Sequence, residues 1–129
     1  MFDFKEYYKV SKNIEQDDEL CAKESYRRTA VSRAYYSAYK ISDEFLKDNY
    51  PTLYSGSVGR GGHQMVWNLF GTVGELRDLG VQNPGLRLLE KRKKADYNSS
   101  DMVNKIDVRL SNNEAETILN KINQDPSES

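Results

Sequence analysis

The stretch from Leu20 to Asp48 constrains the fold more than any other part of this sequence. Within it, small and apolar residues recur at intervals of four, four, three and four residues: Ala30, Ala34, Ala38, Ile41 and Phe45. These intervals place the side chains on one face of an α-helix. A helix of this length spans roughly 40 Å, and its alanines would let a neighbouring helix approach closely. The stretch therefore predicts a long central helix in an all-α bundle.

Shorter helical patterns lie on both sides of this stretch. Residues 4–14 have helical spacing, with Asp3 as the expected N-cap. A second pattern covers residues 63–79, and Gly80 follows it as a C-terminal stop. The residues expected to face inward on this second helix are Val66, Trp67, Phe70, Val73 and Leu76. A third pattern, over residues 83–97, opens with an Asn-Pro pair that is typical of a helix start.

Two segments do not fit a continuous helix. Residues 49–62 contain Pro51 and four glycines, which oppose a helix, so we expect a loop there. Residues 103–110 alternate apolar and polar side chains and are expected to run extended across the surface. Ser111 and Glu114 then form the expected capping box of a last helix, whose inward residues are Ala115, Ile118, Leu119 and Ile122.

Composition limits the classes of protein to consider. The chain has 129 residues, so we expect one domain over residues 1–123 and a polar tail over residues 124–129. The net charge of -1 excludes a uniformly basic nucleic-acid-binding protein but not a local basic patch. The single cysteine, Cys21, excludes a disulfide within the chain, and the single histidine, His63, excludes a multi-histidine metal site. There is neither a signal peptide nor a run of apolar residues long enough to span a membrane, so we expect a cytoplasmic protein with no membrane span. We also expect no metal and no cofactor.

The central helix carries the first group of residues that could do chemistry. Arg33 lies beside the inward alanine face, with Tyr36 and Ser37 about one turn further along. One interpretation is an ordinary arginine that packs its stem and pairs its head with a carboxylate. The other is a half-buried guanidinium held for phosphate or carboxylate binding, to which its planar fork is suited.

The second group lies on the helix that ends at Tyr97. Five of the eight residues from Arg87 to Lys94 are basic. Arg92 and Asp96 are one turn apart and can form an ion pair. This basic run has two interpretations. It is either a solvated helix face, or a surface whose basic side chains, Lys93 among them, contact a nucleic-acid backbone while Tyr97 stacks on a nucleobase.

The third group surrounds His63, where a glycine-rich segment meets the predicted helix over residues 63–79. Arg60 precedes this histidine and Trp67 follows it by one turn. Such a histidine either caps and packs the helix, or acts as a hydrogen-bond donor or base. The glycine-rich sequence over residues 59–62 could hold an anion on backbone amides, but it lacks the lysine and hydroxyl residue of a phosphate-binding loop.

Two strings, AVSRAYYSAYK (Ala30–Lys40) and KRKKADYN (Lys91–Asn98), resemble the HEPN superfamily. The string GHQMVWNLF (Gly62–Phe70) between them is similar in style. The likeness covers residues 20–123 and is closest to the small single-domain bacterial and archaeal members. It implies an up-and-down bundle of four to five helices that forms a two-fold homodimer with a cleft between protomers. Many such proteins are toxins or defence proteins encoded beside a minimal nucleotidyltransferase, which the resemblance implies as a possible antitoxin partner.

The sequence departs from this family at its catalytic signature. Catalytic HEPN proteins are metal-independent ribonucleases in which an arginine is followed, after four to six residues, by a histidine. Here Arg92 is followed at that distance by Tyr97, and residues 56–58, which would have to supply the arginine for His63, contain none. A tyrosine, with a pKa near 10, is a poor general base at neutral pH.

Three interpretations of function remain open. The first is a dimeric module that binds RNA, a nucleotide or a partner protein in a cleft lined by Arg33, Tyr36, Arg92, Asp96 and Tyr97. The second is a metal-independent endoribonuclease toxin, with Arg92 at the phosphate and Tyr97 or His63 in proton transfer. The third is a structural scaffold in which the Arg-Asp-Tyr set is a polar clasp. We favour the first because the ribonuclease signature is incomplete.

Overall fold

The computed structural model describes residues 1–57 and 62–122 of the chain. Over these residues the chain forms eight helices and no strand, which confirms the predicted all-α class. The long helices are α1 (Lys5–Gln16), α3 (Glu24–Asn49), α7 (Gln82–Tyr97) and α8 (Lys105–Lys121). The short helices are α2 (Asp18–Cys21), α4 (Pro51–Ser55), α5 (Gly62–Leu69) and α6 (Gly74–Leu79). No helix of the described ranges is both long and apolar enough to cross a membrane.

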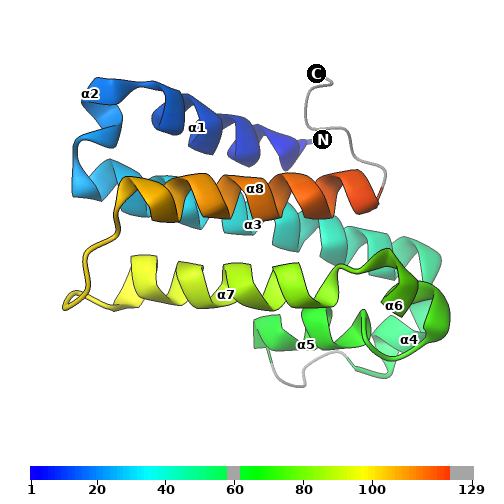
Figure 1. The fold of residues 1–129 in the computed structure, drawn as a ribbon. Helices are drawn as coiled ribbons and strands as arrows, with labels where there is room; N and C mark the ends of the chain where they lie inside the picture. Colours follow the sequence, from blue (N-terminus) through cyan, green and yellow to red (C-terminus); the bar gives the residue numbers. More distant parts are fainter. Residues whose placement is uncertain (58–61, 123–129) are drawn as a thin grey trace.

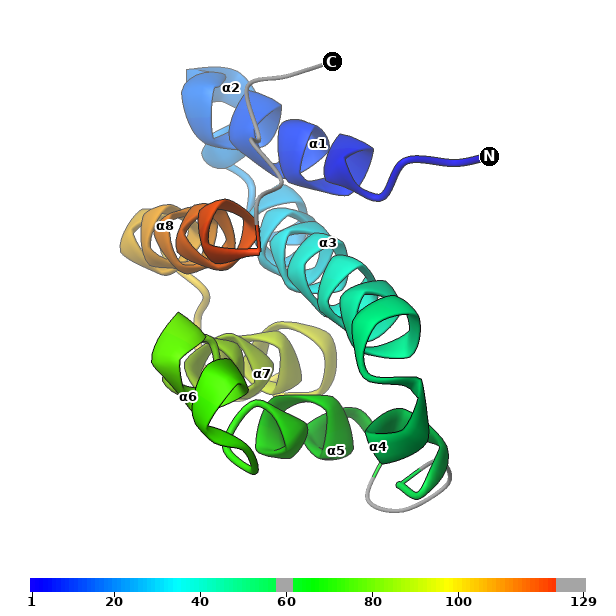
Figure 2. The ribbon, with the colours of Figure 1, turned by 90° about the vertical axis from the view of Figure 1, so that its right-hand side faces the viewer.

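The long helices alternate in direction along the chain, with α1 and α7 running one way and α3 and α8 the other (Figure 1). α3 contacts α1, α7 and α8 and is therefore the centre of the packing. Viewed from the end, α1 lies on one side of α3, and α7 and α5 lie on the other (Figure 2). The core that joins them contains completely buried side chains from α3, α5, α7 and α8, among them Tyr35, Trp67, Leu88 and Leu119.

The predicted long central helix is confirmed, although it begins later than expected. α3 starts at Glu24, and the residues just before it form the separate helix α2, whose N-cap is Asp17. Three members of the predicted stripe are completely buried: Ala30, Ala34 and Ala38. Phe45, at the end of the stripe, is only half-buried. The small side chains thus face the closest helix packing, and the larger ones lie nearer the edge.

Arg28 on α3 fixes the position of the end of α7. Its Nη1 donates to the carbonyl oxygens of Lys94 and Ala95, each at 3.0 Å. Its Nη2 donates to the carbonyl of Asp101, just beyond α7, at 2.6 Å. The carbonyls of Ala95 and Asp101 lie at or beyond the helix end, where backbone acceptors lack intrahelical partners. The Lys94 carbonyl also accepts from the N–H of Asn98 at 3.2 Å. The last turn of α7 is therefore held against α3.

A glycine brings α7 close to α5. Gly85 is buried, and a Cβ atom at this position would overlap the indole ring of Trp67. Any larger residue would force the two helices apart, because a well-packed core has no spare volume. The close approach brings α5, which begins with Gly62 and His63, alongside α7.

The prediction of a loop over residues 49–62 is wrong in its first part. Residues 51–55 form α4, with Pro51 at the first helical position. Proline is tolerated there because its missing N–H would have no partner in the helix. Residues 58–61, which include Arg60 and most of the glycine-rich sequence, lie outside the described residues.

The prediction of one helix over residues 63–79 is also wrong, because the chain turns between α5 and α6. The N–H of Phe70 bonds to the carbonyl of Trp67 at 3.2 Å, and that of Gly71 bonds to Asn68 at 2.9 Å. These shorter-range bonds tighten the end of α5 and stop it. Val73, expected inward, is 38% exposed in the turn. Gly80 ends α6 in the left-handed conformation, with φ of 71°, as predicted.

The extended segment predicted over residues 103–110 is wrong, because α8 already begins at Lys105. Asn104 is its N-cap: the side-chain oxygen accepts from the N–H of Asp107 at 2.9 Å, and the Asp107 carboxylate accepts from the N–H of Asn104 at 3.0 Å. Ser111, the predicted cap, lies inside α8 and is completely buried. Likewise α7 begins at Gln82, slightly before the predicted start at the Asn-Pro pair.

The two candidate caps of the last helix can be compared directly. We expect Asn104→Ala to lower the free energy of unfolding by about 1 kcal/mol, because it removes a reciprocal cap. Ser111→Ala should leave stability unchanged or raise it slightly, since the Ser111 hydroxyl has no hydrogen-bond partner among the described residues. Urea unfolding followed by circular dichroism measures both values. A larger loss for Ser111→Ala than for Asn104→Ala would contradict the observed start of α8.

Candidate functional site

Polar and aromatic side chains from α3, α5 and α7 meet on one side of the bundle. We call this set the Arg92 cluster; it consists of Arg33, Tyr35, Tyr36, His63, Arg92, Asp96 and Tyr97. Tyr35 and Tyr36 are neighbours on α3, so their side chains point in different directions. Tyr35 is completely buried, whereas Tyr36 is half-buried at the flank of the core. The cluster therefore extends from the core to the surface.

Arg92 is the hub of the cluster. Its Nε donates to the Asp96 carboxylate at 2.9 Å, and its Nη2 donates to the hydroxyls of Tyr36 at 2.7 Å and Tyr97 at 3.0 Å. The guanidinium also lies over the ring of Tyr97, 5.1 Å from its centroid. The Arg92 side chain is only 12% exposed. Burial opposes its charge, but Tyr36, Tyr97 and Asp96 together outweigh that effect and raise the pKa of Arg92.

Arg33 lies on the other flank of Tyr36. Its guanidinium carbon is 4.5 Å from the ring centroid of Tyr7 on α1 and 5.1 Å from that of Tyr36. Its Nη2 donates to the Ser32 hydroxyl at 3.4 Å, and that hydroxyl donates to the Asp96 carboxylate at 3.4 Å. Aromatic faces thus hold Arg33 by cation–π contact. Asp96 is linked to both arginines, to Arg92 directly and to Arg33 through Ser32.

His63 joins the cluster through the buried hydroxyl of Tyr35. Its Nδ1 is 2.9 Å from this hydroxyl, which also accepts a hydrogen bond from Trp67 Nε1 at 3.2 Å. The imidazole stacks on Tyr39, with ring centroids 4.2 Å apart. Burial lowers the pKa of His63, and the positive charges of Arg92 and Lys40 lower it further, against a smaller opposite effect of Asp43. Its surroundings therefore favour the neutral form of the imidazole.

The surface beside the cluster is hollowed at two places. One hollow, of about 390 Å³, is lined by Arg28, Thr29, Ser32, Arg33, Ala95 and Asp96. The other, of about 460 Å³, lies at the end of α7, where Lys93 and Lys94 line it together with Tyr97 and the carboxylates of Glu90 and Asp101. Tyr97 is 71% exposed. Both hollows are shallow and polar and contain basic side chains, so they suit an extended anionic ligand better than an enclosed small molecule.

The basic run of α7 is largely committed to packing against α8. Arg87 forms an ion pair with Glu114 at 3.1 Å. Lys91 and Lys94 both pair with Asp107, at 3.9 and 3.1 Å. For these three of the five basic residues, the contacts favour the interpretation in which the basic run is a solvated helix face. Arg92 and Lys93 remain on the side of the cluster, where Lys93 pairs with the exposed Glu90.

The structure brings together the residues predicted for the cleft: Arg33, Tyr36, Arg92, Asp96 and Tyr97. It adds His63, which the sequence analysis assigned to a separate group. Sequence reasoning missed Tyr35, Tyr39 and Trp67 as the link between them. The available signal was the aromatic spacing on α3, since residues four apart lie on one helix face. Across the described ranges, no three His, Cys, Asp or Glu side chains gather closely enough to hold a metal ion.

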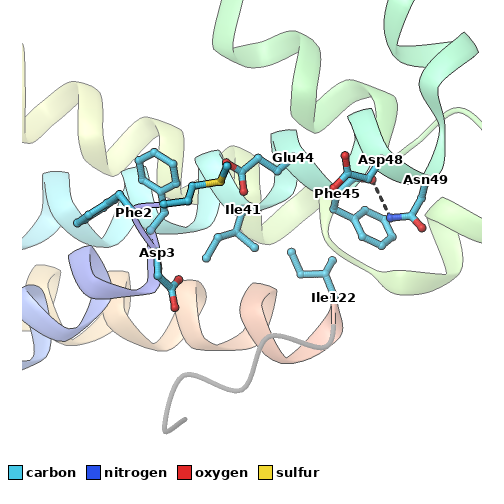
Figure 3. Close-up of a pocket in the computed structure, with 10 residues that line it drawn as sticks. Phe2, Asp3, Ile41, Glu44, Phe45, Asp48, Asn49 and Ile122 are labelled. Atoms are coloured by element: carbon cyan, nitrogen blue, oxygen red, sulfur yellow. Dashed lines mark hydrogen bonds between the residues drawn. The ribbon is translucent and has the colours of Figure 1, made fainter. Parts of the chain in front are cut away.

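A third hollow, of about 320 Å³, shares no residue with the Arg92 cluster. Figure 3 shows its apolar side chains, Ile41, Phe45 and Ile122, with the carboxylates of Asp3, Glu44 and Asp48 around them. Carboxylates repel phosphate, so this hollow does not suit a nucleotide or RNA. The Arg92 cluster is therefore the candidate site for an anionic ligand.

The Arg92 cluster is the basis on which a function can be assigned to this chain. It combines two arginines, a neutral histidine and an exposed tyrosine, all drawn from helices that pack on one another. Such a set can donate hydrogen bonds to an anionic oxygen and offer a face for stacking. Comparison with models of protein families, with curated proteins and with solved structures gave no match for this chain.

Proposed function

We propose that this chain is a HEPN-like protein that binds RNA or a nucleotide at the Arg92 cluster. The family assignment is supported by the two resembling strings, Ala30–Lys40 and Lys91–Asn98, which supply the central residues of the cluster. It is also supported by the succession of long helices in alternating directions, as in an up-and-down bundle (Figure 1). A toxin–antitoxin or defence role and a nucleotidyltransferase partner belong to the same proposal and rest on the resemblance alone.

The observation that carries the binding proposal is the arrangement of Arg92 and Tyr97. Arg92 holds the exposed Tyr97 ring in place through a hydrogen bond and a cation–π contact. Among the described residues, the Nη1 of Arg92 has no hydrogen-bond partner, so one edge of the guanidinium remains for a phosphate oxygen. A fixed ring beside a fixed guanidinium matches a nucleotide, which presents a base and a phosphate together.

The charge balance of the cluster determines how strongly salt should weaken RNA binding. Asp96 neutralises part of the positive charge of Arg92, and the chain as a whole carries -1. Few phosphates are therefore contacted, and the dependence on salt should be shallow. Single-stranded RNA should bind better than duplex RNA, because a duplex hides the base faces that Tyr97 would stack on.

We expect fluorescence anisotropy with a short labelled single-stranded RNA to give saturable binding that weakens only modestly as the salt concentration rises. Arg92→Gln should weaken it roughly tenfold or more, since hydrogen bonds to charged groups contribute about 1.5–3 kcal/mol. Tyr97→Ala should weaken it by a factor of roughly 5 to 150, from a stacking contribution of about 1–3 kcal/mol per base. Tyr97→Phe keeps the aromatic ring and should therefore lose much less RNA affinity than Tyr97→Ala.

Arg87→Gln is the matched control for this measurement. Arg87 is a basic residue of the same helix, but it pairs with Glu114 on α8 and lies outside the cluster. Its loss removes the same charge and should leave RNA affinity nearly unchanged. Equal effects of Arg87→Gln and Arg92→Gln would reduce the interaction to general electrostatics and overturn the proposal.

The position of His63 favours a second candidate function, that of a metal-independent endoribonuclease. His63 comes from α5, yet its ring centroid is 5.9 Å from that of Tyr36, which accepts a hydrogen bond from Arg92. An arginine and a histidine are thus close in space although the family spacing along the chain is missing.

This candidate predicts that the purified protein cleaves total RNA in the presence of EDTA. Arg92→Ala should abolish cleavage, because it removes the group at the phosphate, and His63→Asn should do the same if the imidazole transfers a proton. Tyr97→Phe tests whether the Tyr97 hydroxyl takes part. Gel electrophoresis of the RNA measures each. Intact RNA with the wild-type protein, or equal cleavage by all variants, excludes the enzyme and leaves the binding proposal standing.

Homodimer formation is part of the proposal and is supported by exposed apolar side chains near the start of α8. Met102 is 64% exposed, Ile106 54% and Leu110 40%. Ile106 and Leu110 are four residues apart on α8 and therefore share one face of this helix. Exposed apolar groups that gather in one region are typical of protein–protein contacts.

We expect the protein to sediment as a dimer, at about twice the 14.9 kDa of one chain. Ile106→Asp should shift it to the monomer, because a carboxylate in an apolar interface is left without a partner. Val73→Asp is the control, since Val73 is similarly exposed but lies in the turn between α5 and α6. A wild-type monomer at micromolar concentration would contradict the dimer.

A further inference from the structure

The hydroxyl of Tyr35 is a buried group with a restricted choice of hydrogen bonds. The Tyr35 side chain is completely buried. Its oxygen accepts from Trp67 Nε1, which can only donate. The hydroxyl hydrogen needs an acceptor in turn, because a buried polar hydrogen without a partner is costly. His63 Nδ1, at 2.9 Å, is the acceptor that the described residues provide.

We infer that Tyr35 is a positioning residue that holds neutral His63 with its proton on Nε2, so that His63 enters the site as a hydrogen-bond donor and not as a base. The direction of the bonds is from Trp67 to Tyr35 and from Tyr35 to His63 Nδ1. The reverse tautomer, with the proton on Nδ1, would make His63 a second donor to the same oxygen. The Tyr35 hydrogen would then point into the core without a partner.

The charged groups around His63 oppose its protonation. Arg92 on α7 and Lys40 on α3 are both positive. Asp43 on α3 is the opposing carboxylate, but it already accepts from the Tyr54 hydroxyl at 2.7 Å and pairs with Lys47 at 3.3 Å. A proton on Nδ1 would also break the bond from Tyr35. Both effects lower the pKa of His63 and favour the neutral ring.

This inference specifies what the Arg92 cluster offers to a ligand. A neutral imidazole with its proton on Nε2 presents an N–H, as the arginines do, and so fits an oxygen acceptor such as a phosphate or a carbonyl. A base that abstracts a proton would need the other tautomer, so this inference and a ribonuclease with His63 as its base exclude each other. The inference concerns the proposed binding site but does not rest on RNA binding, because it can be tested on the free protein.

Nuclear magnetic resonance can test the tautomer without ambiguity of assignment, because His63 is the only histidine of the chain. We expect a long-range proton–nitrogen correlation spectrum of the ¹⁵N-labelled protein at pH 7.5 to show Nδ1 as the unprotonated nitrogen and Nε2 as the protonated one. The titration midpoint should lie below 6.5, the ordinary value for histidine. A protonated Nδ1, or a midpoint above 6.5, would overturn the inference.

Tyr35→Phe removes the hydrogen bond and leaves the ring. We expect the midpoint to rise by about 0.5–1 pH unit, the shift that a hydrogen bond of ordinary strength produces, and Nδ1 to move towards a tautomer-averaged signal. Tyr39→Phe is the matched control: Tyr39 stacks on His63, and no hydrogen bond between the two is found in the described structure. Its midpoint should stay near that of the wild type.

Each further outcome decides the matter. If Tyr35→Phe leaves both the midpoint and the Nδ1 signal unchanged, Tyr35 does not position His63. If Tyr35→Phe and Tyr39→Phe change them equally, the effect is one of packing and the inference is wrong. If RNA binding fails while the tautomer is found as expected, only the proposed function is lost.

Discussion

The contact between Arg28 and the carbonyl end of α7 is the interaction on which the candidate site depends most. Backbone carbonyls at a helix end carry partial negative charge and lack intrahelical donors. Arg28 on α3 donates to the Ala95 carbonyl and also to that of Lys94, and its neighbour Arg27 donates to the carbonyl of Val103 just before α8. Two adjacent arginines thus fix the C-terminal end of α7 and the start of α8 relative to the central helix. Without them, the last turn of α7 could fray away from Tyr36.

The Arg92 cluster is also held together by arginines, whose positive charge is stabilised by hydrogen-bond acceptors and by the faces of aromatic rings. Arg92 bonds to one carboxylate and two phenols, and Arg33 lies against two rings. Side chains fixed in this way lose little freedom when a ligand arrives, so more of the contact energy appears as affinity. The same bonds also mean that a ligand must compete with Asp96 for Arg92. Selectivity for ligands that also stack would follow from this competition.

The sequence predicted those parts of the fold that depend on local pattern. The alanine stripe identified α3, and Gly80 identified the end of α6, because each depends on residues within one or two turns. The start of α8 was mispredicted because Ile106, Val108 and Leu110 fit a period of two as well as a helix over so short a segment. Only Val108 among them is buried, so the alternation reflects one inward residue between two exposed ones. The break after Leu69 was missed because the apolar spacing of Val66, Trp67, Phe70 and Leu76 fits one continuous helix, whereas the backbone bonds of Phe70 and Gly71 end α5 there.

The candidate site was predictable where residues share one helix, and the resemblance added the grouping of Arg33 and Tyr36 with Arg92, Asp96 and Tyr97. Arg92, Asp96 and Tyr97 were grouped correctly because they lie one turn apart. The link from His63 to Tyr35 joins residues 28 positions apart and depends on how α5 packs on α3. No spacing rule contains that information.

The bonding around Tyr35 has a practical consequence for work on this chain. The protein has one tryptophan and one histidine, and both contact the same phenol. Indole fluorescence and imidazole resonances therefore originate from a single place, next to Arg92. Any event that disturbs this place, whether occupation by a ligand or contact with a second molecule, should be visible in two independent native spectroscopic signals without attaching a label.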